Sequence, residues 1–359
     1  MDMTSLTYLH GKPSSQATLR AKPEDFQVTE LLPIEFDGEG EHFYLYVRKI
    51  GQNTAYVAKV IARFAGVPPR DVSVAGQKDR HAVTEQWFCV RLPGKETPSW
   101  TDINTDQIQV LDVKRHRRKL RTGALLGNQF KLCLRDISDS QDIVERIAKI
   151  EKTGVPNYYG EQRFGHGGAN VDRAIQMFAG KKAKDRHKRS MYLSAARSFL
   201  FNLCLSERLQ QFGLAPLAGD AMILAGSNSY FKTDAWDETL EQRLQTNDIG
   251  FSGPLWGQGE LASQGQARDF ELSVCQQHSD LCQGLESYDL KQERKGLLLR
   301  PQQLRYELDA KNNTIILEFV LPSGAFATSV VRELTGYQDA QAMEQQLKQD
   351  EAPNENSGQ

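Results

Sequence analysis

The sequence predicts an α+β protein with two domains, and three observations support this prediction. Its 359 residues exceed the size at which one hydrophobic core usually stops growing, so two domains are expected. An apolar content of 39% with 25% charged residues is typical of a folded globular chain rather than a disordered or fibrous one. Segments with strand composition alternate with segments of helical periodicity along the first 135 residues.

Strand composition predicts the elements of the first part of the chain. The expected strands are residues 26–30, 43–47, 72–75 and 83–92. The last of these carries bulky residues on both alternating sides, which indicates a central strand of a sheet. Between the second and third strands, Asn53 and Thr54 are expected to cap a helix that ends at Gly66.

The chain changes character near residue 154. A helix is indicated by the spacing of Ile143, Ile147 and Ile150, and Gly154 with Pro156 is expected to end it. A later helix is expected to start at about Ser194. Residues 314–320 return to strand composition, but the sequence leaves open whether this strand joins the first sheet. Residues 338–359 are rich in Gln, Asn, Asp and Glu, which predicts a partly disordered tail.

Positive charge is concentrated in the N-terminal part, although the net charge of the whole chain is −2. Residues 1–135 contain twenty Lys and Arg against fifteen Asp and Glu. Residues 114–121 carry six positive side chains and no acid, and a second basic run covers 181–189. Either run alone is more typical of a solvated loop, whereas two runs near aromatic and glycine-rich segments favour a polyanionic partner. The candidate RNA contacts in the first run are Lys114, Arg115, Arg117 and Arg118.

Composition argues against several other classes. The N-terminus has no basic start followed by an apolar stretch, and no apolar run approaches the length of a membrane span, so a cytoplasmic protein is expected. Five dispersed cysteines without a Cys-x-x-Cys pair are typical of buried thiols in a reducing compartment. No phosphate-binding loop is found, and no cofactor or obligate protein partner is indicated.

Two clusters of metal-ligand residue types were weighed. On one continuous helix, Cys275, His278 and Cys282 would share a face, but a fourth ligand is missing and the spacing also fits the inward stripe of an amphipathic helix. The acidic segment 37–42 is interrupted by glycines, which more often mark an exposed turn. Neither cluster predicts a metal site.

The segment GQKDRH at residues 76–81 is the strongest candidate for chemistry. It places the carboxylate of Asp79 between two cations, directly after a predicted strand, and such loops often hold catalytic groups on a rigid sheet. The alternative is a polar hairpin in which Asp79 caps the turn. The residues of this segment alone favour the hairpin.

Several segments, in order along the chain, together resemble the TruD type of tRNA pseudouridine synthase. They are YLHGKP (8–13), KPEDF (22–26), AGQKDRHAVTEQ (75–86), GNQF (127–130), GVPNYYGEQRFG (154–165) and LPSGAFATSVVRE (321–333). The resemblance implies a catalytic domain with the pseudouridine-synthase mixed β-sheet, interrupted by a family-specific α/β insertion domain. The catalytic domain would comprise residues 1–153 and 303–337, the insertion 154–302, and the tail 338–359.

The resemblance also implies a substrate and a site. The substrate would be the uridine at position thirteen in the D arm of tRNA, isomerised to pseudouridine without a cofactor. Asp79 would be the catalytic aspartate and Arg20 its basic partner. The uridine pocket would be lined by Phe26, Asn128 and Phe326, with Phe130 near the base.

The chemistry suits one ionised carboxylate. Asp79 would either attack the sugar or base or remove a sugar proton, and the sequence leaves both open. A guanidinium such as that of Arg20 favours the ionised form. A noncatalytic RNA-binding module and a metal-dependent nuclease or deaminase are the rival classes. The first gives Asp79 no role, and the second requires a stronger ligand set than the sequence contains.

Overall fold

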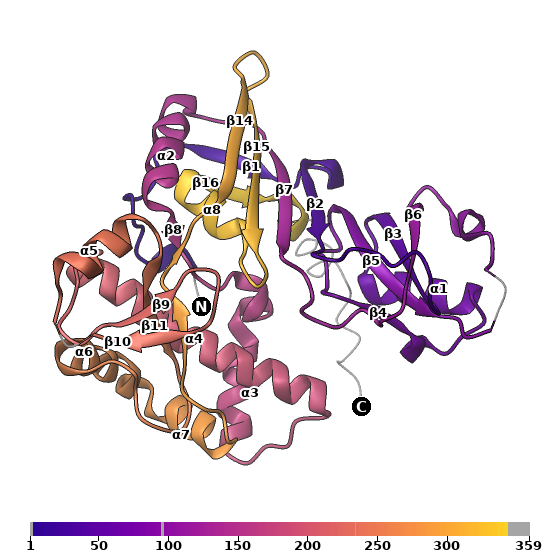
Figure 1. Cartoon of the computed structure of the whole chain (residues 1–359). Coiled ribbons are helices and arrows are strands. Elements are labelled where there is room, and N and C mark those ends of the chain that lie inside the picture. Colours follow the sequence, from indigo (N-terminus) through magenta and orange to yellow (C-terminus); the bar gives the residue numbers. More distant parts are fainter. Residues whose placement is uncertain (1–2, 95–96, 234, 344–359) are drawn as a thin grey trace, which may run out of the picture. The chain divides into compact units, whose positions relative to one another are not determined.

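The structure, a computed structural model, describes residues 3–94, 97–233 and 235–343, and the chain divides into two compact units (Figure 1). Unit 1 comprises Met1–Lys12, Ala148–Arg300 and Ala325–Glu333. Unit 2 comprises Pro13–Ile147, Pro301–Gly324 and Leu334–Gln359. Residues 3–12, 148–153 and 325–333, which were expected in the catalytic domain, cluster with unit 1, and residues 301–302, which were expected in the insertion, cluster with unit 2.

Unit 2 is built on a mixed sheet of eight strands among the residues described (Figure 1). The strand order is β14-β15-β7-β2-β5-β3-β6, with β4 beside β5. The strands are β2 (Phe26–Leu31), β3 (His42–Ile50), β4 (Val72–Val74), β5 (Val83–Arg91), β6 (Ile108–His116), β7 (Gly127–Leu134), β14 (Gln302–Asp309) and β15 (Thr314–Pro322). Strands β2 and β5 are parallel, whereas β2 and β7 are antiparallel. The sheet confirms the predicted central position of residues 83–91.

The late strand β15 does join this sheet, where it lies between β7 and β14. Its register with β7 pairs Leu321 with Asn128 and Phe319 with Phe130. Alternate residues Ile315, Leu317 and Phe319 are almost fully buried, which is the period of a strand with one covered face. A segment nearly 200 residues distant in sequence thus completes the sheet beside two predicted pocket residues.

Helix α1 (Thr54–Phe64) covers part of the sheet with the buried side chains of Val57 and Ile61. Asn53 occupies the N-cap position, as expected, but its side chain makes no capping hydrogen bond. The hydroxyl of Thr54 instead points inward and donates to Gln86 Oε1 at 2.9 Å. Helix α2 (Ser140–Thr153) forms where predicted and ends before Gly154.

Two short strands at opposite ends of the sequence pair in parallel in unit 2. They are β1 (Gln16–Leu19) and β16 (Gly336–Asp339), and Leu19 is in register with Asp339. The segment expected to be disordered therefore begins with an ordered strand, because Gln338 and Asp339 form backbone pairs with β1. Residues 344–359 of that expected tail lie outside the described residues.

Unit 1 combines helices with two small sheets, and its core surrounds α4. Its helices include α3 (Ala169–Phe178), α4 (Arg186–Phe212), α5 (Glu238–Gln245), α6 (Gly265–Cys275), α7 (Ser279–Ser287) and most of α8 (Ala327–Leu334). One sheet has the order β10 (Tyr230–Lys232), β9 (Ala221–Leu224), β11 (Ile249–Leu255) and β12 (Glu293–Gly296). The other pairs β8 (Val155–Pro156) with β13 (Leu298–Leu299). Helix α4 begins at Arg186 rather than near Ser194, because Asp185 accepts from Lys188 N at 2.7 Å and caps it within the second basic run.

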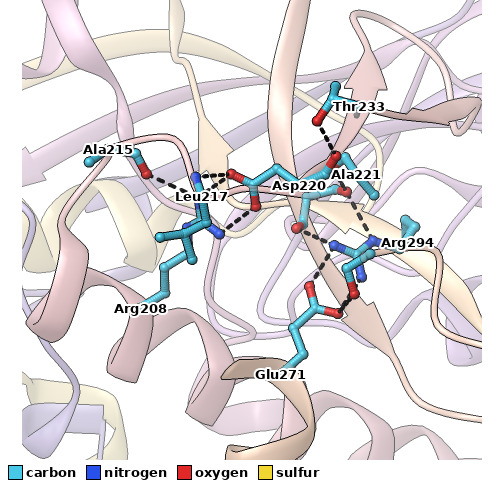
Figure 2. A network of polar contacts seen from close by, with 10 residues as sticks. Arg208, Ala215, Leu217, Asp220, Ala221, Thr233, Glu271 and Arg294 are labelled. Atoms are coloured by element: carbon cyan, nitrogen blue, oxygen red, sulfur yellow. Dashed lines mark hydrogen bonds and ion pairs between the residues drawn. The ribbon is translucent and has the colours of Figure 1, made fainter. Parts of the chain in front are cut away.

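Two buried ion pairs tie the helices of unit 1 to its sheet, as Figure 2 shows. Arg208 of α4 donates to both carboxylate oxygens of Asp220, at 2.6 and 2.7 Å. Arg294 of β12 donates to both oxygens of Glu271 on α6, at 2.9 and 2.8 Å. All four side chains are at most 4% exposed. Buried charges require such complete pairing, so these contacts fix how the helices pack on the strands.

The two clusters of metal-ligand residue types have other structural explanations. Cys275 ends α6 and a 3-10 turn follows before α7 begins, so Cys275, His278 and Cys282 do not lie on one continuous helix. In the acidic segment, Asp37 pairs with His116 at 2.8 Å and Glu41 with Arg91 at 2.7 Å. Among the described residues, no group of three or more His, Cys, Asp or Glu is arranged to hold a metal ion.

None of the helices in the described ranges has both the length and the apolar character needed to cross a bilayer. Four of the five cysteines are buried and Cys133 is half-buried. The cytoplasmic location stays a prediction.

Candidate active site

The candidate catalytic loop, residues 76–81, connects β4 to β5 in unit 2. Asp79 lies near its end, and the side chain is 32% exposed. The carboxylate is therefore open to a ligand while its backbone is attached to two paired strands.

Hydrogen bonds from the sheet and from α1 hold the first half of the loop. Gln86, which is fully buried in β5, donates from Nε2 to the carbonyl of Gly76 at 3.1 Å. Its other side-chain atom, Oε1, accepts from the hydroxyl of Thr54. That hydroxyl in turn accepts from the backbone amide of Lys78 at 3.0 Å. The loop is thus fixed at two backbone points by one connected network.

A buried lysine holds the backbone of Asp79 itself. Lys49 of β3 is fully buried, and its Nζ donates to the Asp79 carbonyl at 2.8 Å. Burial lowers the pKa of Lys49 to about 8, an effect that the neighbouring Asp79 opposes and Lys78 reinforces. An ammonium without bulk water is costly in free energy, so this position is maintained against a desolvation penalty.

The two cations that flank Asp79 in the sequence contact other groups. Lys78 Nζ lies 2.5 Å from Glu30 Oε2 in a pair that is at most 4% exposed. The other oxygen of Glu30 accepts from the Trp87 amide at 3.1 Å. Arg80 donates from Nε to the carbonyl of Gly51 at 3.3 Å. The basic partner of Asp79 therefore comes from elsewhere in the chain.

The structure places the guanidinium of Arg20 beside Asp79. Arg20 Nη2 lies 3.5 Å from Asp79 Oδ2, and Nη1 lies 2.5 Å from Oδ2 of Asp339. The residue directly follows β1 and has φ of +56°, a left-handed conformation that non-glycine residues rarely adopt. Its guanidinium carbon lies 3.9 Å from the centroid of the Phe26 ring. Backbone, aromatic contact and two carboxylates together determine where the guanidinium lies.

Phe26, Phe130 and Asn128 share one face of the sheet beside this pair. In the β2–β7 register, Val28 pairs with Phe130 and Glu30 pairs with Asn128, so these side chains project to the same side as Phe26. Phe26 contacts Phe130 edge to face at 6.2 Å, and Phe130 stacks on Phe319 at 5.6 Å. Arg20 and Phe319 thus already cover one face of each ring.

Asn128 carries an unused acceptor. Its Oδ1 is buried and accepts no hydrogen bond from the part of the chain that the structure describes. A buried polar atom without a partner costs free energy, and such atoms are uncommon in folded proteins. This oxygen is suited to receive an N–H or O–H group from a ligand.

The remaining predicted site residues belong to other elements of the chain. Phe326 belongs to unit 1, where its ring contacts Tyr159 at a centroid distance of 6.2 Å, so its part in the uridine pocket stays a prediction. The candidate RNA contacts Lys114, Arg115, Arg117 and Arg118 lie on or just after β6, an edge strand of the unit 2 sheet, and all are exposed.

Three of the four candidate RNA contacts in the first basic run have partners within the protein. The partners are Asp112 for Lys114 at 3.1 Å, Glu39 for Arg117, and the carbonyl of Gly40 for Arg115 at 2.7 Å. Because these pairs are exposed, solvent screens them and competing phosphates can replace the acids.

Three functional candidates were missed by the sequence interpretation: Lys49, Glu30 and Asp339. Glu30 ends a predicted strand and Lys49 lies two residues beyond another, and only their burial distinguishes them from surface charges. Asp339 falls within the segment expected to be disordered, 319 residues from Arg20. No local pattern connects these residues with residue 79.

Comparisons with known proteins agree on one family. The family model of tRNA pseudouridine synthase D (TruD) matches residues 2–182 and 173–334. The tRNA pseudouridine synthase D of Shewanella oneidensis is 52% identical over 344 residues, covering 96% of this chain and 92% of the relative. That of Aeromonas hydrophila is 51% identical over 340 residues, covering 94% and 96%.

Comparison with solved structures identifies the fold. A putative tRNA pseudouridine synthase D from Methanosarcina mazei has a TM-score of 0.71 and 22% identity, covering 92% of this chain and 95% of its own. At this identity the likeness concerns the fold alone, and it confirms the expected fold class. The extent of the family-model match and the 52% identity to a full-length relative show that the chain belongs to the tRNA pseudouridine synthase D (TruD) family.

Proposed function

We propose that this protein isomerises uridine to pseudouridine in tRNA, at position thirteen of the D arm, with Asp79 as the catalytic carboxylate and without a cofactor. One observation carries the assignment: Asp79 is 32% exposed on a loop whose backbone is fixed at residues 76, 78 and 79, and its carboxylate lies 3.5 Å from Arg20. A fixed carboxylate with a cationic neighbour is the group that this chemistry requires.

The reaction conserves all atoms of the base. The bond between N1 of uracil and C1′ of ribose breaks, a bond between C5 and C1′ forms, C5 loses a proton and N1 gains one. No oxidant, reductant or hydrolytic water is consumed. Asp79 would provide either a nucleophilic oxygen or a base for a sugar proton, and its partial exposure supports both routes.

The residues around Asp79 suit a uracil that has left the RNA stack. Extruding a base costs a few kcal/mol, and stacking on an aromatic side chain returns about 1–3 kcal/mol. Phe26 and Phe130, both buried in this structure, are the aromatic residues of unit 2 that would receive the base, and Phe326 is a further candidate from the family resemblance. The unused Oδ1 of Asn128 would accept from uracil N3–H or a ribose hydroxyl, which would satisfy both partners.

Binding of the folded tRNA would involve surfaces outside this pocket. The exposed side chains of Lys114, Arg115, Arg117 and Arg118 would contact phosphates. Residues 154–302 would form the insertion domain and grip the tRNA body. Their second basic run, at 181–189, is mostly exposed and offers further phosphate contacts.

Asp79→Asn tests the catalytic assignment. The substitution keeps the shape of the side chain and removes its charge, nucleophilic oxygen and basicity, so we expect no pseudouridine while tRNA affinity persists. Pseudouridine formation is measured on purified tRNA, with tRNA carrying cytidine at position thirteen as the substrate control. Asp106→Asn, an exposed aspartate of the same unit, is the matched control and should retain full activity.

Loss of folding is the competing explanation for an inactive variant. Asp79→Asn must therefore melt at the parent temperature and bind tRNA in the same buffer. Substantial turnover by the folded variant would refute the role of Asp79. Pseudouridine at another position by the parent enzyme would refute only the choice of target.

A further inference from the structure

One guanidinium in the candidate active site is shared unequally by two carboxylates. Arg20 lies 3.5 Å from Asp79 through Nη2 and 2.5 Å from Asp339 through Nη1. Charge-assisted hydrogen bonds between such groups are usually about 2.7–2.9 Å. The close partner of Arg20 is therefore Asp339, and its contact with the candidate catalytic carboxylate is long.

Asp339 is itself held in place. It ends β16, where its backbone is in register with Leu19, the residue before Arg20. Its Oδ1 accepts from the amides of Gln341 and Ala342 at 3.2 and 3.3 Å, which leaves Oδ2 for Arg20. The parallel pairing of β1 and β16 thus fixes both members of the ion pair.

Arg20 has little freedom to satisfy its charge in another way. The side chain is 7% exposed, its backbone has φ of +56°, and the guanidinium lies over the Phe26 ring. Its Nε is buried and has no hydrogen-bond partner among the residues described. Among the described residues, Asp339 and Asp79 are the carboxylates within ion-pair distance of this guanidinium.

We propose that Asp339 is a positioning residue for the isomerisation, a role that rests on the proposed catalytic function of Asp79. By holding Nη1, Asp339 keeps the guanidinium beside Asp79, with Nη2 3.5 Å from Oδ2. It also prevents Arg20 from closing into a bidentate pair that would occupy both Asp79 oxygens. One oxygen of Asp79 stays available to the uridine.

Asp339→Asn is the informative substitution. The amide oxygen can still accept from the two backbone amides, while the negative charge that holds Arg20 is lost. Arg20 is then expected to move onto Asp79. We expect kcat to fall by about 10-fold or more with KM nearly unchanged, because a small misplacement of reacting groups has effects of this order.

The pH profile separates positioning from general support of the fold. A closer guanidinium favours the ionised carboxylate, so the acid limb of the kcat profile should move to lower pH in Asp339→Asn. Asp339→Glu keeps the charge, so it should have most of the parent kcat. The low-pH limb of its kcat profile should lie at the same pH as in the parent. An unchanged kcat, or a reduced kcat with an unmoved acid limb at equal melting temperature, would overturn the proposal.

A double-mutant cycle tests whether the effect passes through Arg20. Lys at position 20 presents a point charge that cannot bridge two carboxylates as a guanidinium fork does. In an Arg20→Lys background, Asp339→Asn should therefore change kcat by less than about 2-fold. Multiplicative effects of the two substitutions would contradict an action through Arg20. If Asp79→Asn is inactive and Asp339→Asn behaves as the parent, only the positioning role fails.

Discussion

Replacing Lys49 with Met tests both the stability and the geometry of the catalytic loop. Methionine is unbranched and nearly as long as lysine, so it fills the same fully buried position. It removes the ammonium and with it the 2.8 Å hydrogen bond to the carbonyl of Asp79.

The expected effect on stability depends on pH, and its size follows from the pKa of Lys49. This pKa is about 8 in the folded protein, below the ordinary value of 10.5. Below pH 8 the ammonium is charged in both states, and the folded protein carries the full cost of burying it. Between pH 8 and 10.5 the folded state loses the proton first, so the unfolded chain binds more protons and stability rises with pH. At about 1.4 kcal/mol per pH unit, the rise amounts to about 3 kcal/mol.

The measurement is urea unfolding of the parent and of Lys49→Met at several pH values from 7.5 to 10.5. The free energy of unfolding of the parent should gain about 3 kcal/mol relative to the variant across this range, since all other titrating groups are common to both. Lys49→Arg is the matched control, because arginine stays protonated throughout and should also lack the rise. Parallel curves for the parent and Lys49→Met would refute the reasoning. In activity assays, the lost hydrogen bond should lower kcat about 10-fold with little change in KM.

Two further predictions concern the ion pairs of unit 1 and the RNA surface. Glu271→Gln leaves Arg294 buried without its charge partner and should cost about 3–5 kcal/mol, or about 6–20 °C in melting temperature. Asp248→Asn, which breaks the exposed pair with Arg243, is its control and should cost about 1 kcal/mol or less, so equal losses would contradict the importance of burial. Changing Lys114, Arg115, Arg117 and Arg118 together to Gln should lower the salt slope of tRNA binding by about 2, because two of the four have acidic partners. Lys149→Gln with Lys152→Gln is the control, and an unchanged slope for the quadruple variant would remove the run from the interface.

Local patterns predicted the elements that position Asp79. Alternation of bulky residues on both sides of residues 83–92 indicated a central strand, and β5 is one. This worked because the side-chain period reflects which faces are covered, and both faces of a central strand are covered. The helix before the loop was also predicted, since its inward residues repeat at the helical period.

Local patterns failed where long-range contacts decide the structure. Asn53 has the composition of a cap, but the hydroxyl of Thr54 is used by the loop network instead. Lys78 was considered as a neighbour of Asp79, and its actual partner is Glu30, which is 48 residues away. Pairing of side chains across a sheet depends on register and topology, which a single sequence does not specify.

The pairing of β1 with β16 has a consequence for synthesis of the protein. Arg20 leaves the ribosome early, whereas its partner Asp339 lies 319 residues later. At about 5–20 residues per second, roughly 15–60 s separate the two. During that interval the nascent chain carries Asp79 and Arg20 without the carboxylate that divides the guanidinium between them. The contact between Arg20 and Asp339 can therefore form only after β16 has been synthesised, and a chain released before β16 would lack it.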